Sequence, residues 1–206
     1  EVLPEAEFAL LTREQPRVVP PGQGIGMVVN STPSAGRATR ARLLFQLLVA
    51  SARDSIKICS PYFLPDRSLM AELERAARRG VPVTILTPGK WNNHPITRLA
   101  SRRRYGRLLA AGATVHEYQP AMIHAKVFIV DGLWAVVGST NFDNRSFGLN
   151  DEVNLAVLEK GFAARLEADF AADLERSRVV TLPEWRSRSW AERALALGAR
   201  ILERQV

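Results

Sequence analysis

The sequence predicts an α/β fold in which a mixed β-sheet is sandwiched between helices. Apolar runs typical of strands alternate with segments of helical periodicity along most of the chain. In addition, Asp131-Gly132 marks a tight turn between two apolar runs, which predicts an antiparallel hairpin within the sheet. With 206 residues, of which 47% are hydrophobic, the chain is long enough to bury the core of one domain.

Local signals predict the elements in order. Residues 1–24 are rich in proline and read as an extended lead-in or linker. We then expect strands at 25–30, 55–59, 83–86, 114–118, 125–130 and 152–158, and helices at 38–53, 67–79, 95–111 and 162–178. Asp66 caps the second helix, while Gly80 and Gly112 end the second and third. Residues 181–206 form an amphipathic helical segment, with Trp190 and Leu197 at helical spacing.

The most informative pattern is His124-x-Lys126 followed by Asp131, at the start of an apolar strand. Side chains two residues apart share one face of a strand, so the histidine and the lysine should lie together. A lysine in an apolar strand is costly unless it is paired or binds an anion. A neutral histidine beside it can act as a nucleophile or a proton carrier near pH 7. The pair therefore suggests chemistry on a phosphate ester.

The hairpin adds two polar side chains to this pair. If Asp131-Gly132 is a two-residue turn, Val130 pairs with Leu133, and counting back places His124 opposite Ser139. Asn141 is then a diagonal neighbour on the same face. A nucleophile candidate, a cation, a hydroxyl and an amide in one cluster suit the non-bridging oxygens of a phosphodiester.

These residues resemble a known family. His124 to Asp131, followed by Gly-Ser-Thr-Asn at 138–141, is similar to the HKD motif of the phospholipase D superfamily. Segments 60–66, 117–120 and 150–155 resemble the C-terminal half of bacterial cardiolipin synthases. The likeness runs from about Gly26 to the C-terminus, and the superfamily fold is also an α/β/α sandwich. Residues 25–180 are therefore expected to form a phospholipase D-like catalytic domain with one HKD motif.

The resemblance implies roles for these side chains. His124 would attack phosphorus and carry the phosphatidyl group as a phosphohistidine, while Lys126, Ser139 and Asn141 would hold the phosphoryl oxygens. Glu152 matches a downstream carboxylate that orients the histidine through its other ring nitrogen, unless it is an exposed glutamate at a strand start. Asp131 belongs to the motif, but its place in the turn favours a structural or supporting role.

One feature departs from the family pattern. Enzymes of this family use two HKD motifs, so that one histidine attacks and the other protonates the leaving alkoxide. This chain has one H-x-K, because neither His94 nor His116 is followed by a lysine two residues later. We therefore expect a second HKD half, supplied either by a homodimer mate or by a missing N-terminal portion, and favour the second reading.

Composition excludes little. The net charge is +7, and only four of the 28 basic residues are lysines. A basic surface suits anionic lipid and nucleic acid equally, and an arginine bias of the genome would explain it as well. Cys59 is the single cysteine and is expected to be a small buried side chain. We expect no cofactor and no metal, since three scattered histidines lack ligand spacing.

Two secondary features stay open at the level of sequence. Lys90 and His94 lie in a loop after a strand, where they would bind a headgroup or acceptor, or else be simply exposed to solvent. Arg102-Arg103-Arg104 favours a solvated helix face over a phosphate site. The C-terminal amphipathic segment suits a membrane interface, or equally a helix docked on the domain or a partner.

The leading interpretation is a phosphatidyltransferase that joins two phosphatidylglycerol molecules into cardiolipin with release of glycerol. The expected partners are anionic phospholipid and the surface of the bacterial cell membrane, to which the protein would bind peripherally, because no run of about 18 apolar residues spans it. The alternatives are a homodimeric single-motif nuclease, whose partner is nucleic acid, and a membrane-binding half without catalysis.

Overall fold

The computed structural model describes residues 24–32, 39–92, 95–143 and 145–190, together with Glu192 and Leu195. Its centre is an eight-stranded sheet in the order β1-β9-β7-β6-β2-β4-β5-β10. The strands are β1 (Ile25–Ser31), β2 (Ile56–Cys59), β4 (Val83–Pro88), β5 (Thr114–Tyr118), β6 (Val127–Val130), β7 (Trp134–Gly138), β9 (Glu152–Leu158) and β10 (Ser177–Val180). Strands β3 (Phe63–Leu64) and β8 (Phe142–Asp143) form a small parallel pair beside it.

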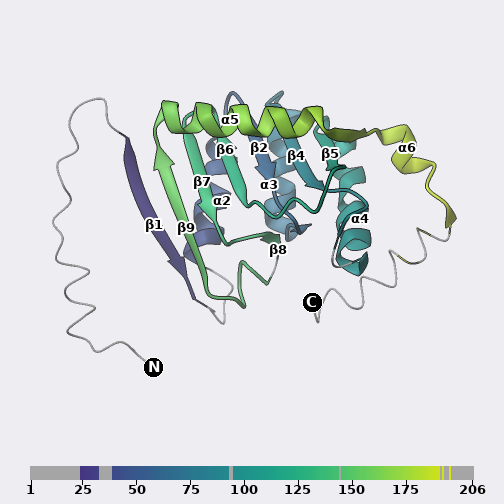
Figure 1. The fold of residues 1–206 in the computed structure, drawn as a ribbon, viewed down its shortest axis with the longest axis horizontal. Helices are drawn as coiled ribbons and strands as arrows, with labels where there is room; N and C mark the ends of the chain where they lie inside the picture. The colour runs from purple at the N-terminus through teal and green to yellow at the C-terminus, as the bar shows by residue number, and fades with distance from the viewer. Residues whose placement is uncertain are drawn as a thin grey trace.

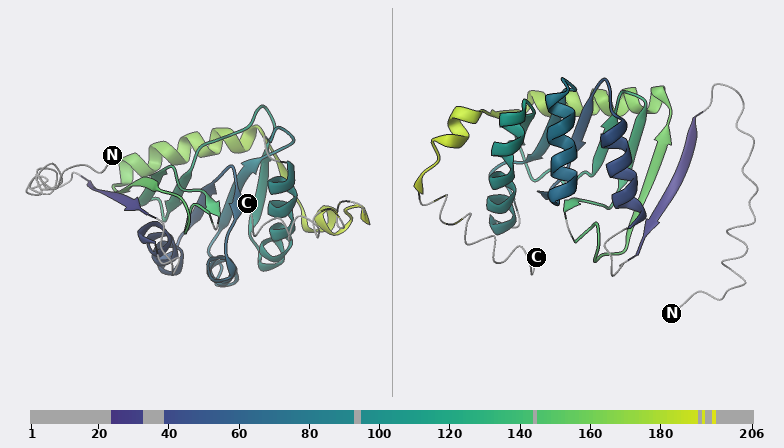
Figure 2. Two further views of the ribbon diagram at one scale, coloured as in Figure 1. Left: turned by 90° about the horizontal axis from the view of Figure 1, so that it is seen from below. Right: turned by 180° about the vertical axis from the view of Figure 1, so that it is seen from behind.

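The sheet is mixed, as the sequence predicts. Strands β2, β4 and β5 are parallel, while β6, β7, β9, β1 and β10 each pair antiparallel with a neighbour. Helices α2 (Arg40–Ser51), α3 (Arg67–Arg78) and α4 (Pro95–Ala111) cover one face. Helix α5 (Lys160–Glu175) crosses the other face, as Figure 1 and the left view of Figure 2 show. The predicted α/β/α sandwich is therefore confirmed.

The helix boundaries have the local causes that the sequence indicates. The carboxylate of Asp66 accepts a hydrogen bond from the backbone N–H of Leu69 at 2.9 Å and so caps α3. Gly80 and Gly112 follow α3 and α4 with φ of 89° and 99°, where a side chain would be strained. These stops return the chain to the sheet at the start of β4 and β5.

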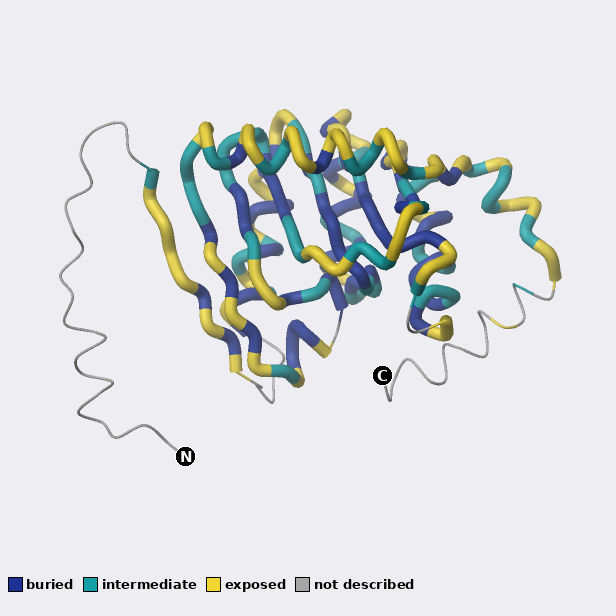
Figure 3. Tube along the Cα trace, in the orientation of Figure 1, coloured by how far each residue is buried: buried dark blue, intermediate teal, exposed yellow. Residues whose placement is uncertain are grey.

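The main core lies between the sheet and α2–α4, and four phenylalanines form its centre. The ring of Phe45 in α2 stacks on that of Phe142 at 4.9 Å and meets those of Phe128 and Phe147 at 5.2 and 5.4 Å. Contacts of this kind contribute about 0.5–1.5 kcal/mol each beyond the burial of area. Since Phe142 follows Asn141 directly, the core fixes the backbone of the Gly-Ser-Thr-Asn segment. Figure 3 shows the central strands buried and β1 exposed at the sheet edge.

The C-terminal part differs from the prediction. The helix expected at 162–178 ends at Glu175, and residues 177–180 form β10 on the edge of β5. Val179 and Val180 favour a strand, and Val180 is 1% exposed in the core. Helix α6 (Leu182–Arg186) follows. Most of the predicted amphipathic segment beyond Trp190 lies outside the described residues. In the ranges that the structure describes, no helix is both long and apolar enough to cross a membrane.

The expectation of a solvated arginine face on α4 is wrong for Arg102. That side chain is buried and pairs with the carboxylates of Glu117 and Glu192. Glu117 is 1% exposed and also pairs with Arg98 at 3.5 Å and Arg178 at 2.9 Å. A buried carboxylate requires such partners because charge is costly away from water. The cluster joins α4, β5 and β10, so Arg102 belongs to the fold.

Candidate active site

His124 and Lys126 lie in the segment between β5 and β6, and their side chains are in contact. The ammonium Nζ of Lys126 is 2.9 Å from Nδ1 of His124, 3.3 Å from Nε2 and 3.0 Å from its carbonyl oxygen. The predicted strand at 125–130 begins only at Val127. The two side chains nevertheless meet as expected, and the His124 side chain is open to solvent.

The surroundings of His124 favour the neutral form of its imidazole. Partial burial and, secondarily, the charge of Lys126 lower the pKa of His124 below its usual 6.5. The pKa of Lys126 is lowered by burial, and the nearby carboxylates of Glu152 and Asp143 oppose that shift. A neutral imidazole has a free lone pair on one ring nitrogen, while the adjacent ammonium can neutralise an anionic group. This pair can therefore deliver a nucleophile to a phosphate ester.

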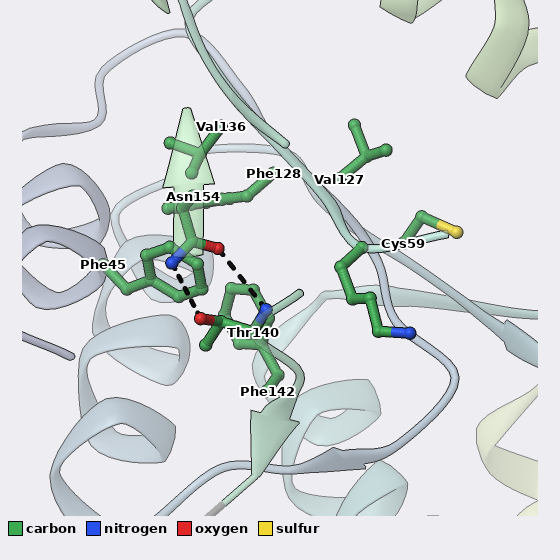
Figure 4. Close-up of a pocket in the computed structure, with 9 residues that line it drawn as sticks. Phe45, Cys59, Val127, Phe128, Val136, Thr140, Phe142 and Asn154 are labelled. Carbon is green, nitrogen blue, oxygen red and sulfur yellow. Dashed lines mark hydrogen bonds between the residues drawn. The ribbon is translucent and has the colours of Figure 1, made fainter. Parts of the chain in front are cut away.

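The Gly-Ser-Thr-Asn segment sits at the end of β7 because its glycine permits close contact with β9. A Cβ added at Gly138 would lie 2.3 Å from the carbonyl oxygen of Val153 and 2.5 Å from Oδ1 of Asn154. Any larger residue would push the two strands apart. Asn154 in turn braces the segment, since its amide donates to Oγ1 of Thr140 at 2.7 Å and its Oδ1 accepts from the Thr140 N–H at 3.4 Å (Figure 4).

Ser139 and Glu152 form a second polar pair in this region. The Ser139 hydroxyl donates to the carboxylate of Glu152, and its Oγ accepts from the backbone N–H of Val153 at 3.0 Å. The side-chain amide of Asn150 also donates to Glu152, at 3.3 Å. Glu152 is 8% exposed, so the reading of an exposed strand-start glutamate is wrong. Its role in orienting the imidazole of His124 stays a prediction.

Asn141 has spare hydrogen-bonding capacity. Its side-chain amide donates to Oγ of Ser146 at 3.3 Å, while its Oδ1 is buried without a hydrogen-bond partner. Asp143, two residues on, is also buried and accepts from the backbone N–H of Ser146 at 2.8 Å. Burial raises the pKa of Asp143. Strand β8 thus carries a polar group at each end, Asn141 just before it and Asp143 as its last residue.

The hairpin turn is partly as predicted. Asp131 and Gly132 both have positive φ, 57° and 59°, and the N–H of Leu133 donates to the Val130 carbonyl at 3.1 Å. The register, however, is wrong by one residue, because Val130 pairs with Trp134 and Leu133 is left as a bulge. When this register is continued beyond the strand ends, His124 no longer lies opposite Ser139. Ser139 instead contacts β9.

Asp131 lies at the opposite end of the hairpin from His124. Its carboxylate accepts hydrogen bonds from three consecutive backbone N–H groups, those of Arg53, Asp54 and Ser55, at 3.0, 2.8 and 2.9 Å. Its own N–H donates to the Ser55 carbonyl at 2.9 Å. These contacts hold the loop before β2 against the turn. These contacts therefore give Asp131 a structural place, at the other end of the hairpin from His124.

Two residues of the neighbourhood were not assigned a role from sequence. The ring of Tyr62 meets that of His124 edge to face, with centroids 6.2 Å apart. Cys59, expected to be buried, is 3% exposed, and burial raises the pKa of its thiol to about 12. It lines a small hollow together with Lys126, the Thr140–Asn154 pair and residues of the phenylalanine core (Figure 4). Lys90 is exposed on its loop, and His94 lies outside the described residues.

Comparison with known proteins places this geometry in a family. Residues 46–174 match the family model described as "Cardiolipin synthase, PLD-like domain". A cardiolipin synthase of Halalkalibacterium halodurans is 40% identical over 162 residues, which cover 77% of this chain and 31% of that protein. Cardiolipin synthase A of Pseudomonas aeruginosa is 41% identical over 168 residues, covering 78% and 34%. The chain thus spans about a third of the length of these relatives.

Solved structures show the same fold at low identity. Nuc of Salmonella typhimurium, a phospholipase D family member, superposes with a TM-score of 0.65 at 22% identity, covering 77% of this chain and 99% of that one. Phosphatidylserine synthase of Haemophilus influenzae gives a TM-score of 0.70 at 14% identity, covering 89% and 46%. Together with the family model and the sequence relatives, this confirms the resemblance, and the chain belongs to the cardiolipin synthase PLD-like domain family of the phospholipase D superfamily.

Proposed function

We propose that this domain supplies one catalytic half of a phosphatidyltransferase that makes cardiolipin from two phosphatidylglycerol molecules. The observation that supports it most directly is the contact of the His124 imidazole with the Lys126 ammonium, and the lowered pKa of His124 favours its neutral form. The Ser139–Glu152 pair and Asn141, with its unpartnered Oδ1, extend the polar surroundings. Membership of the cardiolipin synthase PLD-like family makes a phospholipid the favoured phosphodiester.

The reaction would proceed in two displacements. A ring nitrogen of His124 attacks phosphorus, the bond from phosphorus to the glycerol oxygen breaks, and a histidine of a second HKD motif gives that oxygen its proton. The hydroxyl of a second phosphatidylglycerol then attacks the phosphorus of the phosphohistidine, and the bond from phosphorus to His124 breaks. The proton of that hydroxyl passes to the second histidine. A covalent intermediate divides one difficult displacement into two easier ones.

The other side chains would act on charge and position. Lys126, Ser139 and Asn141 would stabilise the phosphoryl oxygens as negative charge develops on them. Glu152, buried and bonded to Ser139, would orient the nucleophile and support the imidazolium form. The second HKD motif would come from a homodimer mate or from another part of a longer protein. The protein would associate peripherally with the surface of the bacterial cell membrane.

The test is a lipid mass spectrum after incubation of the chain with phosphatidylglycerol vesicles. Formation of cardiolipin with loss of phosphatidylglycerol is expected, and His124→Ala or Lys126→Ala should abolish it while circular dichroism stays unchanged. Substantial turnover in either folded variant would refute the assignment. If the chain alone is inactive, the same assay with a separately supplied second HKD half must restore activity, and failure of that mixture counts against the proposal.

A homodimeric phosphodiesterase that cleaves nucleic acid is the second candidate. Nuc, a phospholipase D family member of which this chain covers 99%, consists of a single domain of this kind, and the net charge of +7 suits nucleic acid as well as anionic lipid. Cleavage of plasmid DNA that falls steeply with salt, without any cardiolipin, would favour it. Vesicle binding without turnover in any assembly state would instead indicate a membrane-binding half.

A further inference from the structure

Three large apolar side chains are exposed on the edge of the sheet that carries His124. They are Trp91, Ile96 and Leu149, exposed by 54%, 47% and 58%. We call this surface the site edge. It consists of the segments where β2, β4, β5 and β7 end and where β6 and β9 begin, along the lower side of the sheet in Figure 1.

The three side chains flank the histidine. Trp91 and Ile96 follow the carboxyl end of β4, and Leu149 precedes the first residue of β9. Strands β7, β6 and β2 lie between, so the two flanks are four inter-strand steps or roughly 19 Å apart. His124 leads into β6, near the middle of that span. A flat surface that touches both flanks would therefore lie across the nucleophile.

Backbone hydrogen bonds fix the turn that carries Leu149 and the start of the loop that carries Trp91. The N–H groups of Gly148, Leu149 and Asn150 all donate to the carbonyl of Arg145, and Phe147 anchors the same turn in the core. On the other flank, the N–H of Gly89 donates to the Tyr118 carbonyl at 2.8 Å just before the loop. Leu149 therefore projects from an ordered turn, and exposing it has no structural benefit for the domain alone.

Basic residues accompany the apolar ones. The ammonium of Lys90 lies 5.0 Å from the ring centre of Trp91, an arrangement in which cation and indole share one surface. Helices α2 and α3 begin at the same edge, so that exposed Arg40 and Arg67 lie there, and Arg145 is exposed beside Leu149. Asp151 is the exposed acid of this turn. Tryptophan with lysine and arginine is the combination found at the headgroup level of membranes.

We propose that the site edge docks on an anionic lipid bilayer, with Trp91 and Leu149 inserted on either side of His124. The choice of a phospholipid bilayer as the partner rests on the proposed function, because docking on it would present headgroup phosphates to the candidate nucleophile. Apolar burial supplies part of the affinity, and attraction of the basic residues to anionic headgroups supplies the rest.

Vesicle sedimentation tests the surface without any need for turnover. The double variant Trp91→Ala/Leu149→Ala is expected to bind phosphatidylglycerol vesicles about tenfold more weakly than the unchanged chain, because two interfacial side chains are lost. Leu47→Ala is the matched control, as Leu47 is 59% exposed on α2 away from the site edge, and it should bind normally. Lipids brominated on the acyl chain should quench the fluorescence of Trp91, compared with Trp91→Phe.

Three results would overturn the proposal. The first is equal vesicle binding by the double variant and Leu47→Ala, and the second is equal binding of the unchanged chain to phosphatidylcholine and phosphatidylglycerol vesicles. The third is a double variant that loses self-association in sedimentation velocity while it still binds vesicles normally. The last result would make the site edge an interface between copies of the chain. Binding that depends on Trp91 and Leu149 without any cardiolipin would support the surface and reject the proposed reaction, so the two ideas fail separately.

Discussion

Asp131 offers the sharpest separation between a structural and a chemical role in the HKD motif. Its carboxylate accepts from three consecutive backbone N–H groups at 2.8 to 3.0 Å, and its own backbone has φ of 57°. Asp131→Ala removes all three acceptor contacts and leaves a residue that disfavours this conformation. The free energy of unfolding should therefore fall, although the residue lies far from His124.

The expected loss is about 2–4 kcal/mol. Hydrogen bonds to a charged group contribute roughly 1.5–3 kcal/mol each when buried, but this carboxylate is only half-buried and the freed N–H groups regain water. About 1 kcal/mol of backbone strain is added. With a urea dependence of about 2 kcal/mol/M, the unfolding midpoint should shift down by roughly 1–2 M. Circular dichroism during urea titration measures this shift.

Asp131→Asn is the matched control. Asparagine keeps one oxygen acceptor and tolerates positive φ, so it should lose less than half as much stability as alanine. A midpoint shift below about 0.25 M for Asp131→Ala would refute the structural reasoning. Loss of turnover in a fully folded Asp131→Asn protein would show that the carboxylate takes part in the reaction.

Three further predictions concern the site. Gly138→Ala should cost about 1–3 kcal/mol or more in urea unfolding, because its Cβ would lie 2.3 Å from a β9 carbonyl oxygen, and an unchanged midpoint would contradict this close approach. Tyr62→Leu should lower kcat with little change in KM, and Tyr62→Phe should restore it, since the ring of Tyr62 packs edge to face against that of His124. Equal loss in both variants would assign the effect to the hydroxyl. The pKa of His124, measured by NMR with His124→Ala to assign the signal, should lie below 6.5, because burial and Lys126 both lower it. The neutral form then persists into mildly acidic solution, and kcat/KM should decline only below pH 6.5. A titration midpoint above 6.5 would contradict these effects.

The central sheet and its helices were predictable because their signals are local. The predicted bounds of α4 and β5 match the structure to the residue, and Asp66, Gly80 and Gly112 marked helix ends through capping and positive φ. β10 was missed because its four residues continue a helix-like pattern and become a strand only by pairing with β5. That pairing is a tertiary effect.

The same distinction separates the parts of the site. The spacing of His124 and Lys126 predicted their contact, although the strand expected to align them begins only at Val127. At Leu133 the carbonyl accepts a hydrogen bond at 3.1 Å from the N–H of Glu159, the residue that follows β9, and the hairpin sequence alone carries no signal of this contact, so it gave the wrong register. The contact of Tyr62 with His124 likewise joins segments 62 residues apart and has no local signal.

The most direct test of the account is detection of the phosphatidyl group on His124. The chain, with a second HKD half if turnover requires it, is mixed with phosphatidylglycerol, quenched at alkaline pH to preserve phosphohistidine, digested, and analysed by mass spectrometry. We predict that the peptide containing His124 gains the mass of a phosphatidyl group, and that His124→Ala carries no adduct. Steady formation of cardiolipin with the adduct on another residue, or with none in single-turnover samples, would contradict the assignment of His124 as nucleophile.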